Sequence, residues 1–250
     1  MRQKNLVSLF ICLCLCLMVQ TAGAAPEPEA LIQSMTTYMK SLPQFYVAGQ
    51  ANYDQVYLNN NKIQYAVNFD YYVKRPGEFQ LNLEGDVQHK QILFNGKSLT
   101  IYDEDKAVYA IMDTPATIDE ALDKALKEYG MSLALLDVGR SNFGANILKD
   151  VQKSAYVGKS YVGNLLCHHV AFAKEKLNLQ LWIEAGDKPF LRKFLVTFKD
   201  NPAMPTWSAE ITDWNLSPVL PEGWTTFVPK PGMRKIEFVK PSNQPASAIK

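Results

Sequence analysis

The chain has 250 residues, 47% of them hydrophobic and 20% charged, and its formal net charge is +1 at pH 7. Basic and acidic residues are nearly equal in number, at 26 and 25, and no basic cluster occurs. This composition argues against a nucleic-acid partner and against electrostatic docking on anionic lipid. The length is sufficient for one large β domain with an ample core, or for two small domains.

The N-terminus, residues 1–24, is typical of a secretory signal peptide. Arg2 and Lys4 give it a positive start, an apolar run follows over residues 6–19, and small residues end the segment. We expect cleavage after Ala24 and export to the periplasm, which leaves a chain with a formal charge of −1. A membrane anchor is the alternative, but the apolar run is shorter than the ~20 residues that a spanning helix needs.

Export also bears on how the fold is stabilised. The sequence has 4 cysteines, and those at positions 12, 14 and 16 lie within the signal peptide, so that Cys167 alone remains in the mature chain. A chain with one thiol cannot form an internal disulfide, and packing must hold it together.

An amphipathic helix is predicted over residues 28–42. Pro28 suits the first turn of a helix, and Pro43 stops it. Apolar residues recur at three- and four-residue spacing and form one stripe, which consists of Leu31, Ile32, Met35, Tyr38, Met39 and Leu42. We expect this stripe to pack against a sheet.

A long first strand is predicted over residues 45–57, and an antiparallel meander is predicted to follow it over residues 63–112. After this strand, apolar side chains occupy every second position from Ile63 to Val73, which is the pattern of a strand with one buried face. Turn residues divide the rest of the segment at 75–77, at 85–86 and at Asn95-Gly96, the last being a strong hairpin signal. Because these connections are short, neighbours in sequence should be neighbours in the sheet.

The hydrophobic period changes between residues 117 and 149, which we expect to form a helical insert. Thr117 and Glu120 have the spacing of a capping box, and Gly130 is placed to end the helix. Residues 131–138 are more apolar, and residues 142–148 are expected to add a further helical turn. Helices inserted between two β segments must lie across the sheet, because only there can their apolar stripes be buried.

A second β segment begins near Ser154. Its turns are at Gly163-Asn164 and at residues 186–189, and its alternation is cleanest over residues 177–183. Together the two segments contain about eleven strands, mostly joined as hairpins. The sequence therefore predicts an α+β, mainly β fold in which a curved antiparallel sheet forms a single domain over residues 25–240. A loose tail, residues 241–250, should follow it.

Little in the sequence points to catalysis. Cys167 and His169 lie two positions apart on one predicted strand, so they could belong to a metal site or a nucleophilic pair. A metal site needs further ligands, and no other cysteine remains. The sequence contains no phosphate-binding loop, nucleophile elbow or zinc-binding helix motif. We therefore predict no catalytic residues, no cofactor and no metal.

The sheet has more apolar surface than its few helices can cover. Aromatic side chains recur at alternate strand positions, and most should belong to the core. The surface that remains must form a cavity, a dimer interface or a partner surface. We predict a ligand cavity lined by strand residues Tyr65, Val67, Phe69, Tyr71, Leu81, Leu83 and Leu181 and by insert residues Leu122, Leu126, Leu135 and Leu136.

Several short motifs, taken in order, resemble one family over nearly the whole mature chain. They are Val73-Lys74-Arg75-Pro76, Asn95-Gly96-Lys97 with residues 99–103, residues 117–122, Cys167-His168-His169, residues 180–183 with Lys188-Pro189, and Asp213-Trp214. The chain is similar to domain-of-unknown-function family 2092, predicted periplasmic proteins within the LolA-like (LolA/LppX) superfamily of lipoprotein carriers. It departs from the pattern at Gly77, where an acid is common, and at Gly163-Asn164, where Asp-Gly is commoner.

The resemblance implies an incomplete β-barrel, with the N-terminal helix and the helical insert as a lid over an apolar cavity. Relatives of known role carry acylated cargo there; the resemblance implies no catalytic residues and does not name the cargo. Our first hypothesis is a soluble periplasmic carrier for a hydrophobic ligand: a lipid, an acyl chain or a lipidated protein. The second is a non-catalytic interaction module that docks an envelope protein through the same apolar surface. The third is an enzyme that uses Cys167 and His169.

Overall fold

The computed structural model describes residues 25–132 and 134–240. The expected signal peptide and the C-terminal tail beyond residue 240 lie outside these ranges, so both stay predictions. Within the two ranges, no helix is both long enough and apolar enough to cross a membrane.

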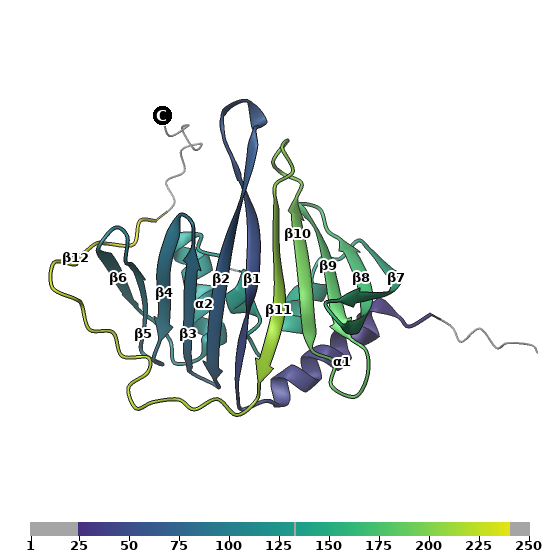
Figure 1. The fold of residues 1–250 in the computed structure, drawn as a ribbon, viewed down its shortest axis with the longest axis horizontal. Helices are drawn as coiled ribbons and strands as arrows, with labels where there is room; N and C mark the ends of the chain where they lie inside the picture. The colour runs from purple at the N-terminus through teal and green to yellow at the C-terminus, as the bar shows by residue number, and fades with distance from the viewer. Residues whose placement is uncertain (1–24, 133, 241–250) are drawn as a thin grey trace, which may run out of the picture.

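One twelve-stranded sheet organises the described residues (Figure 1). Its first half is an antiparallel meander of β1 (Gln44–Val56), β2 (Lys62–Lys74), β3 (Glu78–Gly85), β4 (Gln88–Phe94), β5 (Ser98–Asp103) and β6 (Val108–Asp113). Its second half is another antiparallel meander, made of β7 (Lys153–Val162), β8 (Leu165–Ala173), β9 (Leu177–Glu184), β10 (Leu191–Phe198) and β11 (Thr206–Asn215). A short 3-10 helix, Leu58–Asn60, lies in the loop between β1 and β2.

The two halves meet where β1 pairs with β11, and the register of this pair shifts between Ala48 and Gly49. A Cβ atom at Gly49 would lie 1.9 Å from the carbonyl oxygen of Glu210, so only glycine lets the two backbones approach this closely. Farther along the same pair, Asp54 of β1 accepts hydrogen bonds from the backbone N–H and the hydroxyl of Thr206, at 2.8 and 2.9 Å. Backbone pairing and a buried carboxylate therefore join the halves.

The helices of the described residues lie on one side of this sheet (Figure 1). They are α1 (Pro28–Ser41), α2 (Ile118–Tyr129), α3 (Ala134–Asp137) and α4 (Phe143–Leu148). α1 packs against α4, β7 and β8, whereas α2 lies behind β3 and β4 (Figure 1). Thr117 caps α2 as expected, because its hydroxyl accepts a hydrogen bond from the Glu120 N–H at 3.3 Å. The Glu120 carboxylate accepts from the Thr117 hydroxyl at 2.7 Å. Gly130 ends α2 in the left-handed conformation, with φ 64°.

The main difference from the predicted fold is β12 (Arg234–Lys235), which pairs in parallel with β6. The sheet is therefore mixed rather than wholly antiparallel. A two-residue strand is too short to show alternation in the sequence, so its position depends on tertiary contacts. Phe227, in the preceding segment, supplies one by packing against Tyr102 and Tyr109. The two meanders, the open curvature and the helical insert are confirmed; α1 ends at Ser41, one residue earlier than expected.

Candidate functional site

The two halves of the sheet are packed differently against the helices. In the first half, Phe45, Tyr71, Phe79 and Phe94 are fully buried and fill the interior. The ring of Phe79 has its centroid 5.8 Å from that of Tyr71 and 5.5 Å from that of Phe94, so the rings pack directly on one another. In the second half, most residues of the inner face are aliphatic, and several of them remain partly accessible.

An apolar groove with a cavity volume of about 220 Å³ lies over this second half. Alternate residues of β9 and β10 share one face of the sheet and make its floor: Leu177, Leu179, Leu181, Phe194, Val196 and Phe198. Helical-insert residues Ala134, Phe143 and Ile147 oppose this floor. Polar groups complete the lining, and they are Ser132, Asp137, Asn146 and Lys174. The groove is thus mainly apolar and polar at a few positions, as ligand sites commonly are.

A polar pocket of about 320 Å³ adjoins the groove. Ser132, Asp137 and Asn146 line both cavities, so the two share a boundary. The rest of the polar pocket is formed by residues of α2 and of the segments around α3 and α4: Leu122, Asp123, Leu126, Met131, Leu136, Arg140 and Lys149. An apolar space and a polar space therefore lie next to each other under the helical insert.

Arg140 holds the polar pocket together. Its guanidinium is almost fully buried and donates from Nε to Asp137 and from Nη1 to Asp123, both at 2.7 Å. Nη1 also donates to the backbone carbonyl of Asp119 at 3.1 Å. Burial raises the pKa of Asp137, although the charge of Arg140 and its hydrogen bond act in the opposite direction. These bonds tie α2 to α3 and so hold the parts of the insert together.

A third cavity, the small pocket, has a volume of about 200 Å³ and lies over the first half. Leu135 of α3 lines it, whereas the preceding residue, Ala134, lines the apolar groove. One turn of helix therefore separates the two cavities. The remaining walls of the small pocket are Tyr53, Val67, Leu81, Leu83, Gln88 and Trp207.

The structure distributes the expected cavity residues over three sites instead of bringing them into one. Of these residues, Leu181 lines the apolar groove. Three others line the polar pocket, and they are Leu122, Leu126 and Leu136. Four line the small pocket, and they are Val67, Leu81, Leu83 and Leu135. Contact between any of these side chains and a ligand stays a prediction.

The other three expected cavity residues lie in different surroundings. Phe69 is buried in the packed core. Tyr71 is fully buried as well, and its hydroxyl donates to the Leu136 carbonyl at 3.2 Å. The ring of Tyr65 stacks on Tyr53, and its hydroxyl lies 2.7 Å from that of Tyr57, near the β1–β2 turn. The contacts of these three aromatics are with the protein's own side chains and backbone.

Most of the residues that line the apolar groove were not predicted from the sequence. The alternation that selects Leu181 also includes Leu177 and Leu179, so those two could have been found. Phe194 and Val196 lie opposite Leu181 and Leu179 in the β9–β10 pair, and the strand register identifies them. The α4 residues and Lys174 had no comparable signal, because their place depends on how the insert folds back over the sheet.

Cys167 and His169 are not arranged as a nucleophilic pair. Cys167 is fully buried, and burial, reinforced by the nearby carboxylate of Glu184, raises the pKa of its thiol to about 11. The Nε2 atom of His169 lies 2.9 Å from the side-chain oxygen of Gln180, and its ring stacks on Trp182 at 4.1 Å between centroids. Each residue therefore has a local structural explanation.

Comparisons with known proteins give one match over most of the chain. The family model described as "Predicted periplasmic protein (DUF2092)" matches residues 28–239. No curated protein matches. Among solved structures, the chain is similar to an uncharacterized conserved protein from Thermus thermophilus, with 9% identity, a TM-score of 0.48, and 84% of this chain and 98% of that chain covered.

Two further similar structures are, by their printed names, a lipoprotein and a LolA superfamily protein. For Mycobacterium tuberculosis lipoprotein LppX the identity is 12% and the TM-score 0.48, with 76% of this chain and 96% of that chain covered. For a LolA superfamily protein from Nitrosomonas europaea the identity is 11% and the TM-score is 0.37, with 81% of this chain and 99% of that chain covered.

Proposed function

The chain belongs to the DUF2092 family of predicted periplasmic proteins, and from that premise we propose that it is a soluble periplasmic carrier of a hydrophobic ligand. The ligand is a lipid or an acyl chain, either free or attached to a protein. It lies in the apolar groove, between the floor of β9 and β10 and the roof of α3 and α4. The protein acts by taking up and releasing this ligand, without catalysis.

The lining of the apolar groove is the observation that supports this proposal. Apolar side chains of two neighbouring strands face apolar side chains of the insert across a space of about 220 Å³. Burying a methylene group is worth about 0.8 kcal/mol, so six methylenes of an acyl chain would contribute roughly 5 kcal/mol. Such a ligand needs few polar contacts, which fits the scarcity of polar side chains in the groove.

The surroundings of Cys167 support the non-catalytic part of the proposal. A nucleophilic cysteine requires an accessible thiolate, and this thiol is fully buried with its pKa raised to about 11. Replacement of Cys167 should therefore leave any activity of the protein intact. The rival proposal, a docking module for an envelope protein, would use the same apolar surface and predicts that no small hydrophobic molecule binds.

Native mass spectrometry of protein purified from the periplasm tests the proposed function. We expect additional mass that disappears after organic extraction, together with an extract that contains lipids or fatty acyl chains. Addition of a defined lipid to delipidated protein should restore the bound species. A protein that is free of lipid when purified and takes up none from detergent-free solution would contradict the carrier proposal and favour the docking module.

A further inference from the structure

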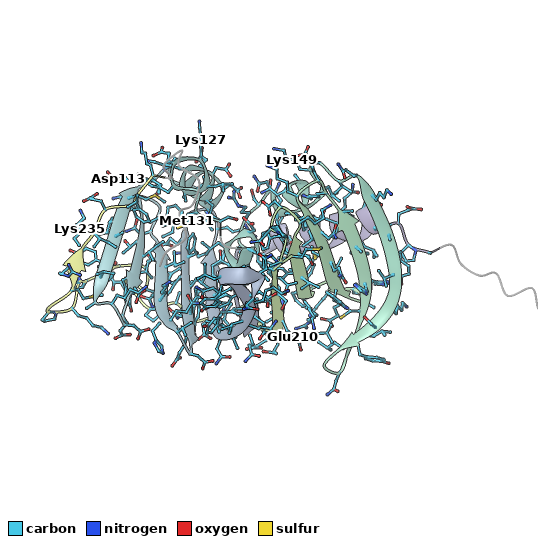
Figure 2. The ribbon with its side chains drawn as sticks, turned by 90° about the horizontal axis from the view of Figure 1, so that it is seen from above. Asp113, Lys127, Met131, Lys149, Glu210 and Lys235 are labelled. Atoms are coloured by element: carbon cyan, nitrogen blue, oxygen red, sulfur yellow. The ribbon has the colours of Figure 1, made fainter. Side chains whose placement is uncertain are left out.

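Two lysines lie where the apolar groove adjoins the polar pocket. Lys174 lines the groove, and its ammonium donates to the backbone carbonyl of Asn146 at 2.9 Å. Asn146 lines both cavities, so this ammonium lies at their shared boundary. Lys149, directly after α4, lines the polar pocket. Figure 2 shows Lys149 above the half of the molecule that contains β7–β10.

The charges around this boundary favour a negative ligand group. Three cationic side chains, those of Arg140, Lys149 and Lys174, line the two cavities, whereas only two carboxylates do. Both carboxylates, those of Asp123 and Asp137, already pair with Arg140. Within residues 25–132 and 134–240, neither Lys149 nor Lys174 has a carboxylate at ion-pair distance. Burial lowers the pKa of Lys174, the negative charge of Asp150 acts in the opposite direction, and the positive charge of Lys149 adds a smaller contribution in the same direction as burial.

We infer that the carrier prefers an anionic single-chain amphiphile, with its hydrocarbon tail in the apolar groove and its carboxylate or phosphate head between Lys149 and Lys174. This assignment rests on the proposed function, since it names the class of ligand for the same groove. A charged acceptor strengthens a hydrogen bond from an ammonium group, and the apolar floor beside it lowers the local dielectric. The tail supplies binding energy, and the head fixes the orientation of the ligand.

Isothermal titration of delipidated protein with decanoate, with decanol and with inorganic phosphate tests this assignment. The first two probes share a ten-carbon tail and differ in the charge of the head. A hydrogen bond to a charged group contributes about 1.5–3 kcal/mol, so decanoate should bind about tenfold or more tightly than decanol. Inorganic phosphate, which has the charge without the tail, should bind far more weakly than decanoate.

The same titrations are repeated on two variants. One is the double variant Lys149→Gln with Lys174→Gln, and the other is Lys127→Gln, which is the matched control. Lys127 is exposed on α2 and lies above the other half of the molecule (Figure 2). The double variant should bind both ten-carbon probes with similar affinity, and the control should keep the preference for decanoate. Lys149 is exposed, so the single variant Lys149→Gln should fold normally and must by itself reduce the preference.

The possible outcomes separate this inference from the proposed function. Equal affinity of the wild-type protein for decanoate and decanol, or a preference that survives in the double variant, would overturn the inference and leave the carrier proposal intact. Phosphate binding as tight as that of decanoate would also overturn it, because the anion site would then not depend on a tail. Failure of both ten-carbon probes to bind would overturn the carrier proposal and the inference together.

Discussion

The two halves of the sheet have the same topology but different interiors. β1–β4 bury Phe45, Tyr71, Phe79 and Phe94, and these rings pack against one another. The inner face of β9 and β10 carries mostly leucine and valine, and the apolar groove lies between it and the insert. The first half also contains a cavity, the small pocket of about 200 Å³, but none of these four rings lines it. The groove differs in adjoining the polar pocket, with which it shares Ser132, Asp137 and Asn146.

If the proposed function holds, the first half contributes mainly to stability and the second half to ligand binding. The four packed rings of the first half can help to hold the fold without a disulfide, because each contributes much buried apolar area. The other half can then leave space for a ligand without unfolding. α3 lies between the two, with Ala134 on the groove and Leu135 on the small pocket.

The largest expected effect is on the packed half. Phe79→Ala removes a fully buried ring from contact with Tyr71 and Phe94 and should lower the free energy of unfolding by about 3–5 kcal/mol. Leu179→Ala, in the wall of the groove, should cost roughly 1 kcal/mol because its side chain is already partly accessible. Urea unfolding of the two variants measures the difference. Equal losses would show that the halves are equally well packed.

Removal of the buried guanidinium should have the next largest effect. Arg140→Met leaves the carboxylate of Asp137 without its partner and should lower the free energy of unfolding by about 3 kcal/mol. The double variant Arg140→Met with Asp137→Asn should recover part of the loss, because the one carboxylate then left without its partner, that of Asp123, is exposed to solvent. Urea unfolding again provides the measurement. A single variant as stable as the wild type would mean that the insert does not depend on this network.

The stability of the seam between the halves, where β1 pairs with β11, should depend on pH. Burial alone would raise the pKa of Asp54, but hydrogen bonds from Thr206 and the charge of Lys62 outweigh it, so the pKa is lowered from 3.8. The native state therefore binds fewer protons than the unfolded state, and the stability that Asp54 contributes is present above pH 3.8 and lost as the pH falls below it.

Asp54→Asn tests this seam. At neutral pH the variant should be less stable than the wild type by about 2 kcal/mol, since it loses charged hydrogen bonds. The difference should shrink as urea unfolding is repeated at successively lower pH. A difference that is independent of pH would show that the carboxylate charge does not contribute to the joining of β1 and β11.

A bulky side chain in the groove should affect binding more than folding. Leu179→Trp places a large ring in the groove and should lower the affinity for a ten-carbon ligand about tenfold. Val157→Trp, at an exposed position on the edge strand β7, is the matched control and should bind normally. Titration calorimetry measures both. Unchanged affinity in the Leu179 variant would place the ligand elsewhere.

The smallest expected effect concerns the thiol. Cys167 is fully buried and its pKa is raised, so alkylating reagents should modify it only when the protein unfolds. Cys167→Ser should keep the affinity for ligand. Rapid alkylation of the native protein, together with an activity lost in the serine variant, would support the enzyme hypothesis instead.

The two meanders and the capped helix could be predicted because local signals define them. Alternation fixes the strands, Asn95-Gly96 fixes a hairpin, and Thr117 with Gly130 fixes the ends of α2. The location of the groove could not be predicted in the same way. Phe69 and Tyr71 have the same alternation as Leu181, yet two of these side chains fill the core and the third faces a cavity. Which of them meets empty space depends on how α3 and α4 cross the sheet.

Methyl NMR of the delipidated protein, titrated with decanoate, tests the central claim most directly, because it reports on both halves at once. If the apolar groove holds the ligand, the largest shifts should occur at the methyl groups of Leu177, Leu179, Leu181 and Val196. The methyl groups of Val67, Leu81 and Leu83 in the small pocket should change little. Shifts concentrated in the small pocket, or no shifts at a saturating concentration of ligand, would contradict the account.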